Sequence, residues 1–134
     1  LEEGAKEAKR DPKSIEKCLM FPCSYDEDYD RAEAGVARVA ANLVPGMLDL
    51  NVYDPRKIEA LGRLVDRKEY PKLFLIATEP ESLIKKSEEY IRLGFSHVNY
   101  VNFGPDEMKF IRFCGTRVVP ELRNMFGEKR PKTL

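Results

Sequence analysis

The chain has 134 residues, 43% of them hydrophobic, which is enough for one globular domain over residues 1–134 but too short for a closed eight-stranded barrel of about 250 residues. Its 23 basic and 23 acidic residues are interspersed and cancel, which disfavours a surface for nucleic acid or anionic lipid. No apolar run reaches membrane-spanning length and the start has no signal-peptide pattern, so we expect a soluble, cytoplasmic protein.

The beginning of the chain predicts the end of a helix whose start is absent. Leu1, Ala5 and Ala8 recur at helical spacing among charged residues, and there is no initiator methionine. We therefore expect a piece of a longer protein. Pro12 breaks this helix, and the unbroken apolar run that follows predicts a strand from Lys17 to Pro22 that is covered on both faces.

A helix is predicted after that strand. Ser24 and Glu27 have the spacing of a capping box, and apolar residues then recur at helical intervals as far as Pro45. The segment from Met47 to Tyr53 lies between turn signals and is expected to be a loop or insertion. Asp54, followed by a proline, predicts the cap of a further helix that ends near residue 68.

The last third predicts two more strand-to-helix units. A strand from Leu73 to Ala77 precedes Thr78, which is expected to cap a helix that stops at Gly94. A strand over residues 96–102 then leads into a helix that opens at 104–107, and residues 127–134 are expected to form a flexible tail. Consecutive units of this kind imply right-handed crossovers and a parallel sheet.

Residues just past the carboxyl ends of parallel strands commonly form binding sites. Among those residues Ser24, Thr78 and Asn102 are the predicted substrate-pocket residues. The alternative is a purely structural role in which Ser24 and Thr78 only cap helices, whereas capping does not require Asn102. The sequence offers no catalytic residue, no metal site and no nucleotide-binding motif.

The single histidine and the three cysteines are expected to be structural for the most part. His97 would start its strand, away from the carboxyl edge, and no cysteine or carboxylate pairs with it at metal-ligand spacing. An odd number of cysteines favours reduced thiols over disulfides. We expect Cys18 and Cys114 to be buried and inert, and Cys23 to be accessible and more reactive.

Four sequence features in register carry a family resemblance. Between Gly94 and Arg123 the chain has a G-F-x-H-V strand, a G-P-D turn, an F-x-R-F core and a V-x-P-x-L-R ending. Together they resemble the last strand and helix of the bacterial-luciferase-like barrel family, in the branch that uses the deazaflavin coenzyme F420. The resemblance extends back through Phe74 to Glu81, which is similar to the family's seventh strand, and Cys18 to Asp28, which is similar to its sixth.

The resemblance implies a fold of α/β class, a C-terminal half of a (β/α)₈ TIM barrel with parallel strands and flanking helices. It implies an oxidoreductase or monooxygenase-like enzyme that transfers hydride between F420, or alternatively FMN, and a small organic substrate. Residues that hold the ring lie mostly on the family's first five strands, so no cofactor-binding residue carries over. Lys72 stands where sugar-phosphate dehydrogenases of the branch have an arginine, so glucose-6-phosphate specificity is not expected.

Two readings of the whole chain stay open. In the first, it is a fragment that is inactive alone and needs the missing N-terminal half of the barrel, or a second copy, to be complete. In the second, it is a non-catalytic α/β half-barrel that self-associates as a binding or assembly module through its sheet edges or its last helix. Neither reading includes a nucleic-acid or membrane partner.

Overall fold

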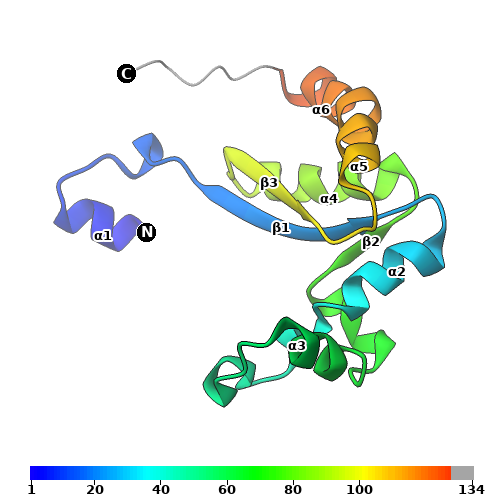
Figure 1. Cartoon of the computed structure of the whole chain (residues 1–134). Helices are drawn as coiled ribbons and strands as arrows, with labels where there is room; N and C mark the ends of the chain where they lie inside the picture. Colours follow the sequence, from blue (N-terminus) through cyan, green and yellow to red (C-terminus); the bar gives the residue numbers. More distant parts are fainter. Residues whose placement is uncertain (128–134) are drawn as a thin grey trace.

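The computed structural model describes residues 1–127, and the predicted tail from 128 onward lies outside them. Three strands alternate with helices along the chain (Figure 1). The elements are α1 (Glu2–Glu7), β1 (Cys18–Tyr25), α2 (Tyr29–Ala37), α3 (Pro55–Gly62), β2 (Leu75–Ala77), α4 (Pro80–Arg92), β3 (His97–Asn102), α5 (Glu107–Phe113) and α6 (Val119–Phe126). Short 3₁₀ turns, η1 to η4, cover Pro12–Ser14, Ala40–Leu43, Met47–Leu50 and Arg67–Lys72, and the π-helical turn η5 covers Cys114–Val118.

The three strands form one parallel sheet in the order β2-β1-β3. Parallel pairing and flanking helices confirm the predicted class. This strand order differs from that of a closed barrel, in which each strand lies beside the next one in sequence. The sequence did not indicate this difference. Here β1 is central, and the connection from β2 through α4 to β3 crosses it. In this part of the chain β2 and β3 each keep one edge that no described strand pairs.

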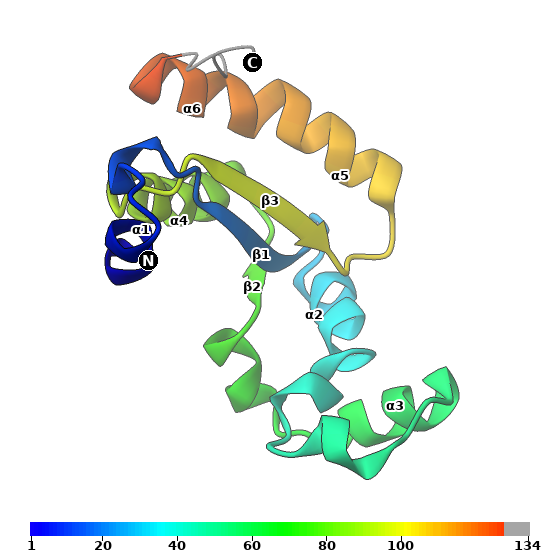
Figure 2. The same ribbon diagram turned by 90° about the vertical axis from the view of Figure 1, so that its left-hand side faces the viewer.

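One face of the sheet carries the larger core. Phe21, Cys23 and Tyr25 of β1 alternate onto this face and are almost fully buried. The helices α4, α5 and α6 and the turn η5 cover it, and the cluster is completed by Ala77, Leu83, Phe110, Cys114 and Val118. Figure 2 shows the long α5–α6 rod lying over the strands on one side, with α2 and α3 on the other side.

The opposite face is covered only toward the carboxyl ends of the strands. There Val36 of α2 and Ala40 pack with Tyr70, Phe74 and neighbouring apolar groups in a second, smaller cluster. Toward the amino ends, alternate residues of β1 face outward, and Met20 is 70% exposed. This uncovered patch departs from the usual pattern, in which both faces of a parallel sheet are buried.

The first strand is longer than predicted, and this moves the helix start. β1 continues through Pro22 to Tyr25, so Ser24 is inside the strand and cannot cap α2 as predicted. Asp28 is the cap instead, because its carboxylate accepts a hydrogen bond from the backbone N–H of Arg31. The capping box of Ser24 and Glu27 is therefore wrong, and the physical reason is that sheet pairing extends the strand by three residues.

Other helix ends agree with the sequence in part. Asp54 caps α3 as predicted, and Gly94 has the expected positive φ of 90° after α4. Thr78 does not cap α4, since the cap position is Glu79 and no side chain bonds there. The helix predicted to reach residue 68 ends at Gly62, where the backbone runs so close to Ala37 that a Cβ would lie 2.4 Å from its carbonyl oxygen.

The final helix also differs in detail. Its cap is Asp106, which accepts a hydrogen bond from the backbone N–H of Lys109, so Pro105 lies before the helix rather than in its first turn. The π-helical turn η5 joins α5 to α6 and keeps one continuous rod. No helix in residues 1–127 is long and apolar enough to cross a membrane.

Candidate functional site

The carboxyl ends of the three strands meet at one edge of the sheet, as predicted. Cys23 of β1 is aligned with Leu75 of β2 and with Asn102 of β3. Asn102 is in this row, Ser24 is one residue beyond it on β1, and Thr78 is three residues beyond Leu75. We call this region the carboxyl edge.

Ser24 is fully buried at this edge and already has a partner. Its hydroxyl donates a 2.6 Å hydrogen bond to the backbone carbonyl of Ala32 on α2. Gly35 allows α2 to come this close, because a Cβ at that position would lie 2.1 Å from the carbonyl oxygen of Phe103 and 2.9 Å from Ser24 Oγ. Ser24 thus fastens a helix to the sheet.

Asn102 joins β3 to β1. Its Oδ1 accepts hydrogen bonds from the backbone N–H groups of Tyr25, at 3.2 Å, and Gly104, at 3.1 Å. Its Nδ2 is buried, and no described group accepts a hydrogen bond from it. An unused buried donor costs free energy unless something outside the described residues accepts from it. Asn102 therefore stabilises the contact between β3 and β1, and its Nδ2 group has no hydrogen-bond partner among the described residues.

Asp26 is the acidic residue of the carboxyl edge that sequence reasoning missed. It directly follows β1 and is only 2% exposed. Its Oδ1 accepts hydrogen bonds from the Asp28 backbone N–H at 3.0 Å and from Lys109 Nζ at 3.3 Å, and Arg31 lies 3.4 Å from Oδ2. The sequence signal that could have found Asp26 is an acidic residue directly after a buried strand. It was missed because β1 was expected to end at Pro22.

Charge at this cluster is balanced within the protein. The Asp28 backbone N–H, followed by Lys109 and Arg31, holds the pKa of Asp26 below its ordinary value despite burial. Burial acts against the Lys109 ammonium, but hydrogen bonds to Glu27 and Asp26 outweigh it and raise the pKa of Lys109. Lys109 therefore stays charged and ties α5 to the end of β1.

The cysteines are placed differently from two of the three predictions. Cys23 is fully buried, and burial, followed by the nearby Cys114, raises its pKa to about 12, so the predicted reactive thiol is wrong. Cys114 is buried as predicted, and burial raises its pKa to about 11. Cys18 is exposed rather than buried, since it faces the uncovered patch. All three are free thiols.

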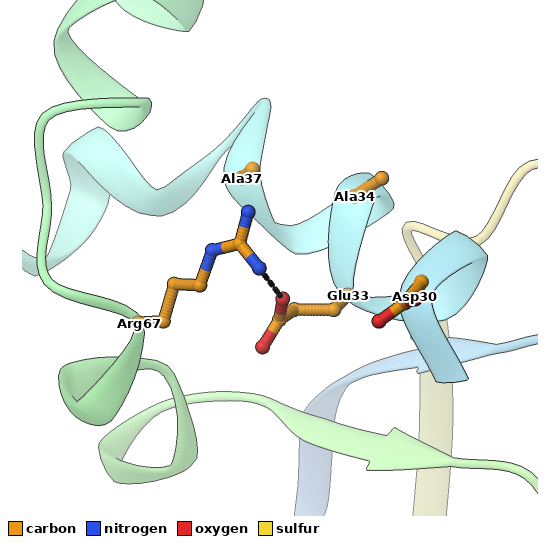
Figure 3. Close-up of a pocket in the computed structure, with 5 residues that line it drawn as sticks. All are labelled: Asp30, Glu33, Ala34, Ala37 and Arg67. Carbon is orange, nitrogen blue, oxygen red and sulfur yellow. Dashed lines mark hydrogen bonds and ion pairs between the residues drawn. The ribbon is translucent and has the colours of Figure 1, made fainter.

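A hollow of about 300 Å³ lies beside α2 (Figure 3), and none of the three predicted pocket residues lines it. Asp30, Glu33, Ala34, Ala37 and Arg67 line it. The Arg67 guanidinium and the Glu33 carboxylate are joined by a 2.7 Å hydrogen bond across it. Arg67 and Glu33 therefore pair with each other, and the two alanines are too small to form the largely apolar and aromatic walls of a ligand pocket.

No protein-family model matches the chain, but several known proteins are similar to it. An F420-dependent glucose-6-phosphate dehydrogenase of Microbacterium testaceum is 25% identical over 127 residues, which is 95% of this chain and 38% of that protein. The 5,10-methylenetetrahydromethanopterin reductase of Methanopyrus kandleri is 28% identical, over 92% of this chain and 40% of its own length.

Two solved structures have the same fold. An F420-dependent secondary alcohol dehydrogenase, in complex with an F420-acetone adduct, superposes with a TM-score of 0.76 and 34% identity, over 91% of this chain and 37% of its own. The coenzyme F420-dependent tetrahydromethanopterin reductase from Methanopyrus kandleri gives 0.63 and 26%, over 90% and 40%.

The chain is therefore of the α/β class, with a parallel sheet and flanking helices, and it is similar to a part of larger barrel enzymes. The relatives of this chain are F420-dependent oxidoreductases of the luciferase-like type, which confirms the predicted resemblance. The chain spans about two fifths of the length of the relatives that it matches.

The carboxyl edge alone does not fit a deazaflavin ring. Ser24, Asn102 and Asp26 use their hydrogen-bonding groups mainly within the chain, and the hollow beside α2 is small and lined by paired charges. Two buried polar atoms there have no hydrogen-bond partner among the described residues, Asn102 Nδ2 and Asp26 Oδ2, and they are too few to orient a ring system. We therefore assign no step of hydride transfer to residues of this chain.

Proposed function

We propose that the chain is the C-terminal part of an F420-dependent oxidoreductase of the luciferase-like type, one that transfers hydride between the deazaflavin and a small organic substrate. The observation that carries this proposal is the similarity to the secondary alcohol dehydrogenase, at 34% identity over 91% of the chain. In such enzymes the cofactor supplies the redox chemistry, and the protein supplies binding and orientation.

The chain is proposed to be inactive alone. The sheet of residues 1–127 has three strands where a barrel of this class has eight, and the polar groups of its carboxyl edge are largely satisfied internally. Ser24 and Asn102 would shape one wall of the substrate pocket, and Thr78 would line it. Free thiols in all three cysteines support the proposed cytoplasmic location.

The experiment compares the isolated chain with the intact gene product. Each is mixed with F420, then with glucose 6-phosphate, a secondary alcohol or methylenetetrahydromethanopterin, while the absorbance and fluorescence of the coenzyme are followed. We expect binding and turnover only if the gene product contains the rest of a barrel, which its intact mass decides. Turnover by the isolated chain would contradict its proposed inactivity. A complete barrel that neither binds nor reduces F420 would contradict the proposed F420-dependent hydride transfer.

The pocket wall is tested in the active protein. Thr78→Ala is expected to raise KM for the substrate several-fold while leaving kcat nearly unchanged, because a lost contact to bound substrate weakens binding. Ser82→Ala is the matched control, since Ser82 lies one turn further on and its hydroxyl donates to the backbone carbonyl of Glu79. Equal KM values for the two variants would remove Thr78 from the pocket.

The second candidate is a self-associating half-barrel without catalysis. It is favoured by the uncovered patch around Met20 and by the edges of β2 and β3 that no described strand pairs. Sedimentation velocity of the isolated chain over a hundred-fold range of concentration tests it. Reversible dimers are expected under this candidate, and a monomer at all concentrations would exclude it.

A further inference from the structure

The segment that follows β3 is fastened to the end of β1 on both sides. Before it, Asn102 Oδ1 accepts a hydrogen bond from the backbone N–H of Tyr25 at 3.2 Å. After it, Lys109 Nζ on α5 reaches back and donates to Asp26 Oδ1 at 3.3 Å. Residues 103–106, which we call the β3–α5 connection, lie between these two anchors. Two adjacent residues at the end of β1 therefore hold the connection at the carboxyl edge.

The connection also packs closely against β1 along its length. The backbone N–H of Phe103 donates to the carbonyl of Cys23 at 2.8 Å. A Cβ at Gly104 would lie 2.4 Å from the carbonyl oxygen of Tyr25, so the two backbones are in direct contact there. Tyr25 and Asp26 are 5% and 2% exposed, and residues of this chain bury them. These contacts therefore do not require a surface that further strands would cover.

Lys109 is the cation that links α5 to the turn after β1. Its backbone N–H donates to the helix cap Asp106 at 2.8 Å, so the connection itself fixes its place on the helix. Its ammonium also lies 3.2 Å from Glu27 Oε2. The other cation near Asp26 is Arg31, but its side chain is 62% exposed, against 29% for Lys109. Lys109 is thus the more buried partner and the one that donates a hydrogen bond to Asp26.

We propose that Asp26 and Lys109 are positioning residues for the hydride transfer proposed above: their ion pair holds the β3–α5 connection so that the pocket wall at Asn102 keeps its place against the bound substrate. This inference rests on the proposed function. Neither side chain transfers a proton or a hydride. A charge-assisted hydrogen bond between poorly exposed groups suits this task, because it is directional and stronger than a neutral one. A misplacement of about 1 Å can cost about 100-fold in rate.

The test uses the intact gene product with F420 and whichever of the three substrates named above the wild type converts. Lys109→Met keeps most of the aliphatic stem and removes the charge. We expect kcat to fall by about 10- to 100-fold, while the KM for the substrate and the dissociation constant for F420 change by less than about 3-fold. Lys109→Arg keeps the charge and is expected to restore most of the wild-type kcat.

Lys86→Met is the matched control. Lys86 donates to Glu89 on the same helix at 2.6 Å, so its ion pair joins no two elements. Its amine lies 5.3 Å from the centre of the Tyr90 ring, much as that of Lys109 lies 5.9 Å from the centre of the Tyr25 ring. This variant is expected to keep the wild-type kcat. Rates are expressed per molecule of bound F420, which separates lost positioning from lost folding.

A double-mutant cycle tests the contact itself in the complete enzyme. If Asp26 and Lys109 act as one unit, adding Asp26→Asn to Lys109→Met lowers kcat no further than the larger single loss. Losses that multiply would overturn the inference, since independent side chains behave in this way.

Three other results would also overturn it: a wild-type kcat in Lys109→Met, a loss confined to KM, or a Lys109→Arg variant as slow as Lys109→Met. A wild-type gene product that neither binds nor reduces F420 is a different outcome, because it contradicts the proposed function itself.

Discussion

The two faces of the sheet are built from the same strands but are covered in different ways. On one face Phe21 lies 5.6 and 5.8 Å from the rings of Tyr90 and Tyr100 and is 4% exposed. On the other face its neighbour Met20 is 70% exposed. The comparison shows that one face supplies most of the hydrophobic core, while the amino half of the other face is exposed in the described residues.

The sharpest test of this difference is a pair of adjacent substitutions. Phe21→Ala is expected to lower the free energy of unfolding by about 3–5 kcal/mol, because it removes a buried ring and leaves a cavity. Met20→Ala is expected to change it by less than about 0.5 kcal/mol. Urea unfolding at pH 7, followed by circular dichroism, measures both. Similar losses would show that the second face is covered in solution.

The covered half of the second face depends on close contact between α2 and the backbone of Phe103, directly after β3. Gly35→Ala is expected to cost about 1–3 kcal/mol, because the new Cβ would lie 2.1 Å from the Phe103 carbonyl oxygen and would force the helix outward. The control is Gly115→Ala, which meets no atom within 4 Å and is expected to stabilise the rod by about 0.5–1 kcal/mol. The same unfolding assay decides, and a neutral Gly35→Ala would mean that α2 does not sit as described.

Asp26 gives a pH-dependent test at the carboxyl edge. Its folded pKa lies below the value of about 3.9 for an unfolded aspartate, so its stabilisation is complete above that pH and is lost as pH falls through the folded pKa. Asp26→Asn is expected to cost about 1–3 kcal/mol at pH 7, from lost charged hydrogen bonds.

The difference between wild type and Asp26→Asn should therefore shrink as unfolding is measured from pH 6 down to pH 3. Asp11→Asn serves as the control, since Asp11 is exposed and caps only the short turn η1. A difference in the free energy of unfolding that stays constant across this range would show that the charge of Asp26 does not stabilise the fold.

The smallest effect concerns thiol chemistry and leaves stability unchanged. One thiol, Cys18, is expected to react quickly with 5,5′-dithiobis(2-nitrobenzoate) at pH 8, because it is exposed. Cys23 and Cys114 are expected to react only after unfolding, since burial raises their pKa values to about 12 and about 11. Cys18→Ser should abolish the fast phase. Two fast thiols would mean that the larger core opens readily.

Local signals in the sequence predicted the units of the fold well. Asp54 and Gly94 mark a helix start and a helix end because capping depends on residues a few positions apart. Parallel pairing followed from repeated strand-to-helix units. The position of β1 between β2 and β3 could not be predicted, because hydrophobic periodicity carries no information on which edge a strand joins.

The place of the three proposed pocket residues in the sheet could be predicted, but their contacts could not. The register brings Ser24, Thr78 and Asn102 to one edge, but the Ser24 bond to Ala32 and the Asn102 bond to Tyr25 depend on tertiary packing. The latter joins residues 77 positions apart. Cys18 was misplaced because a continuous apolar run indicates burial on both faces, whereas half of one face is open here.

The π-helical turn at Cys114–Val118 has a consequence for how the rod tolerates insertions and deletions. A π turn closes with one more residue than a regular α-helical turn. Deleting one residue there, such as Gly115, would convert the turn to regular α-helical geometry, and because the wider turn had absorbed that residue, the residues beyond it would keep nearly the same direction about the axis. Leu122 would then still face the larger core that it now contacts. The turn thus accommodates one extra residue while the same stripe of the last helix stays against the sheet.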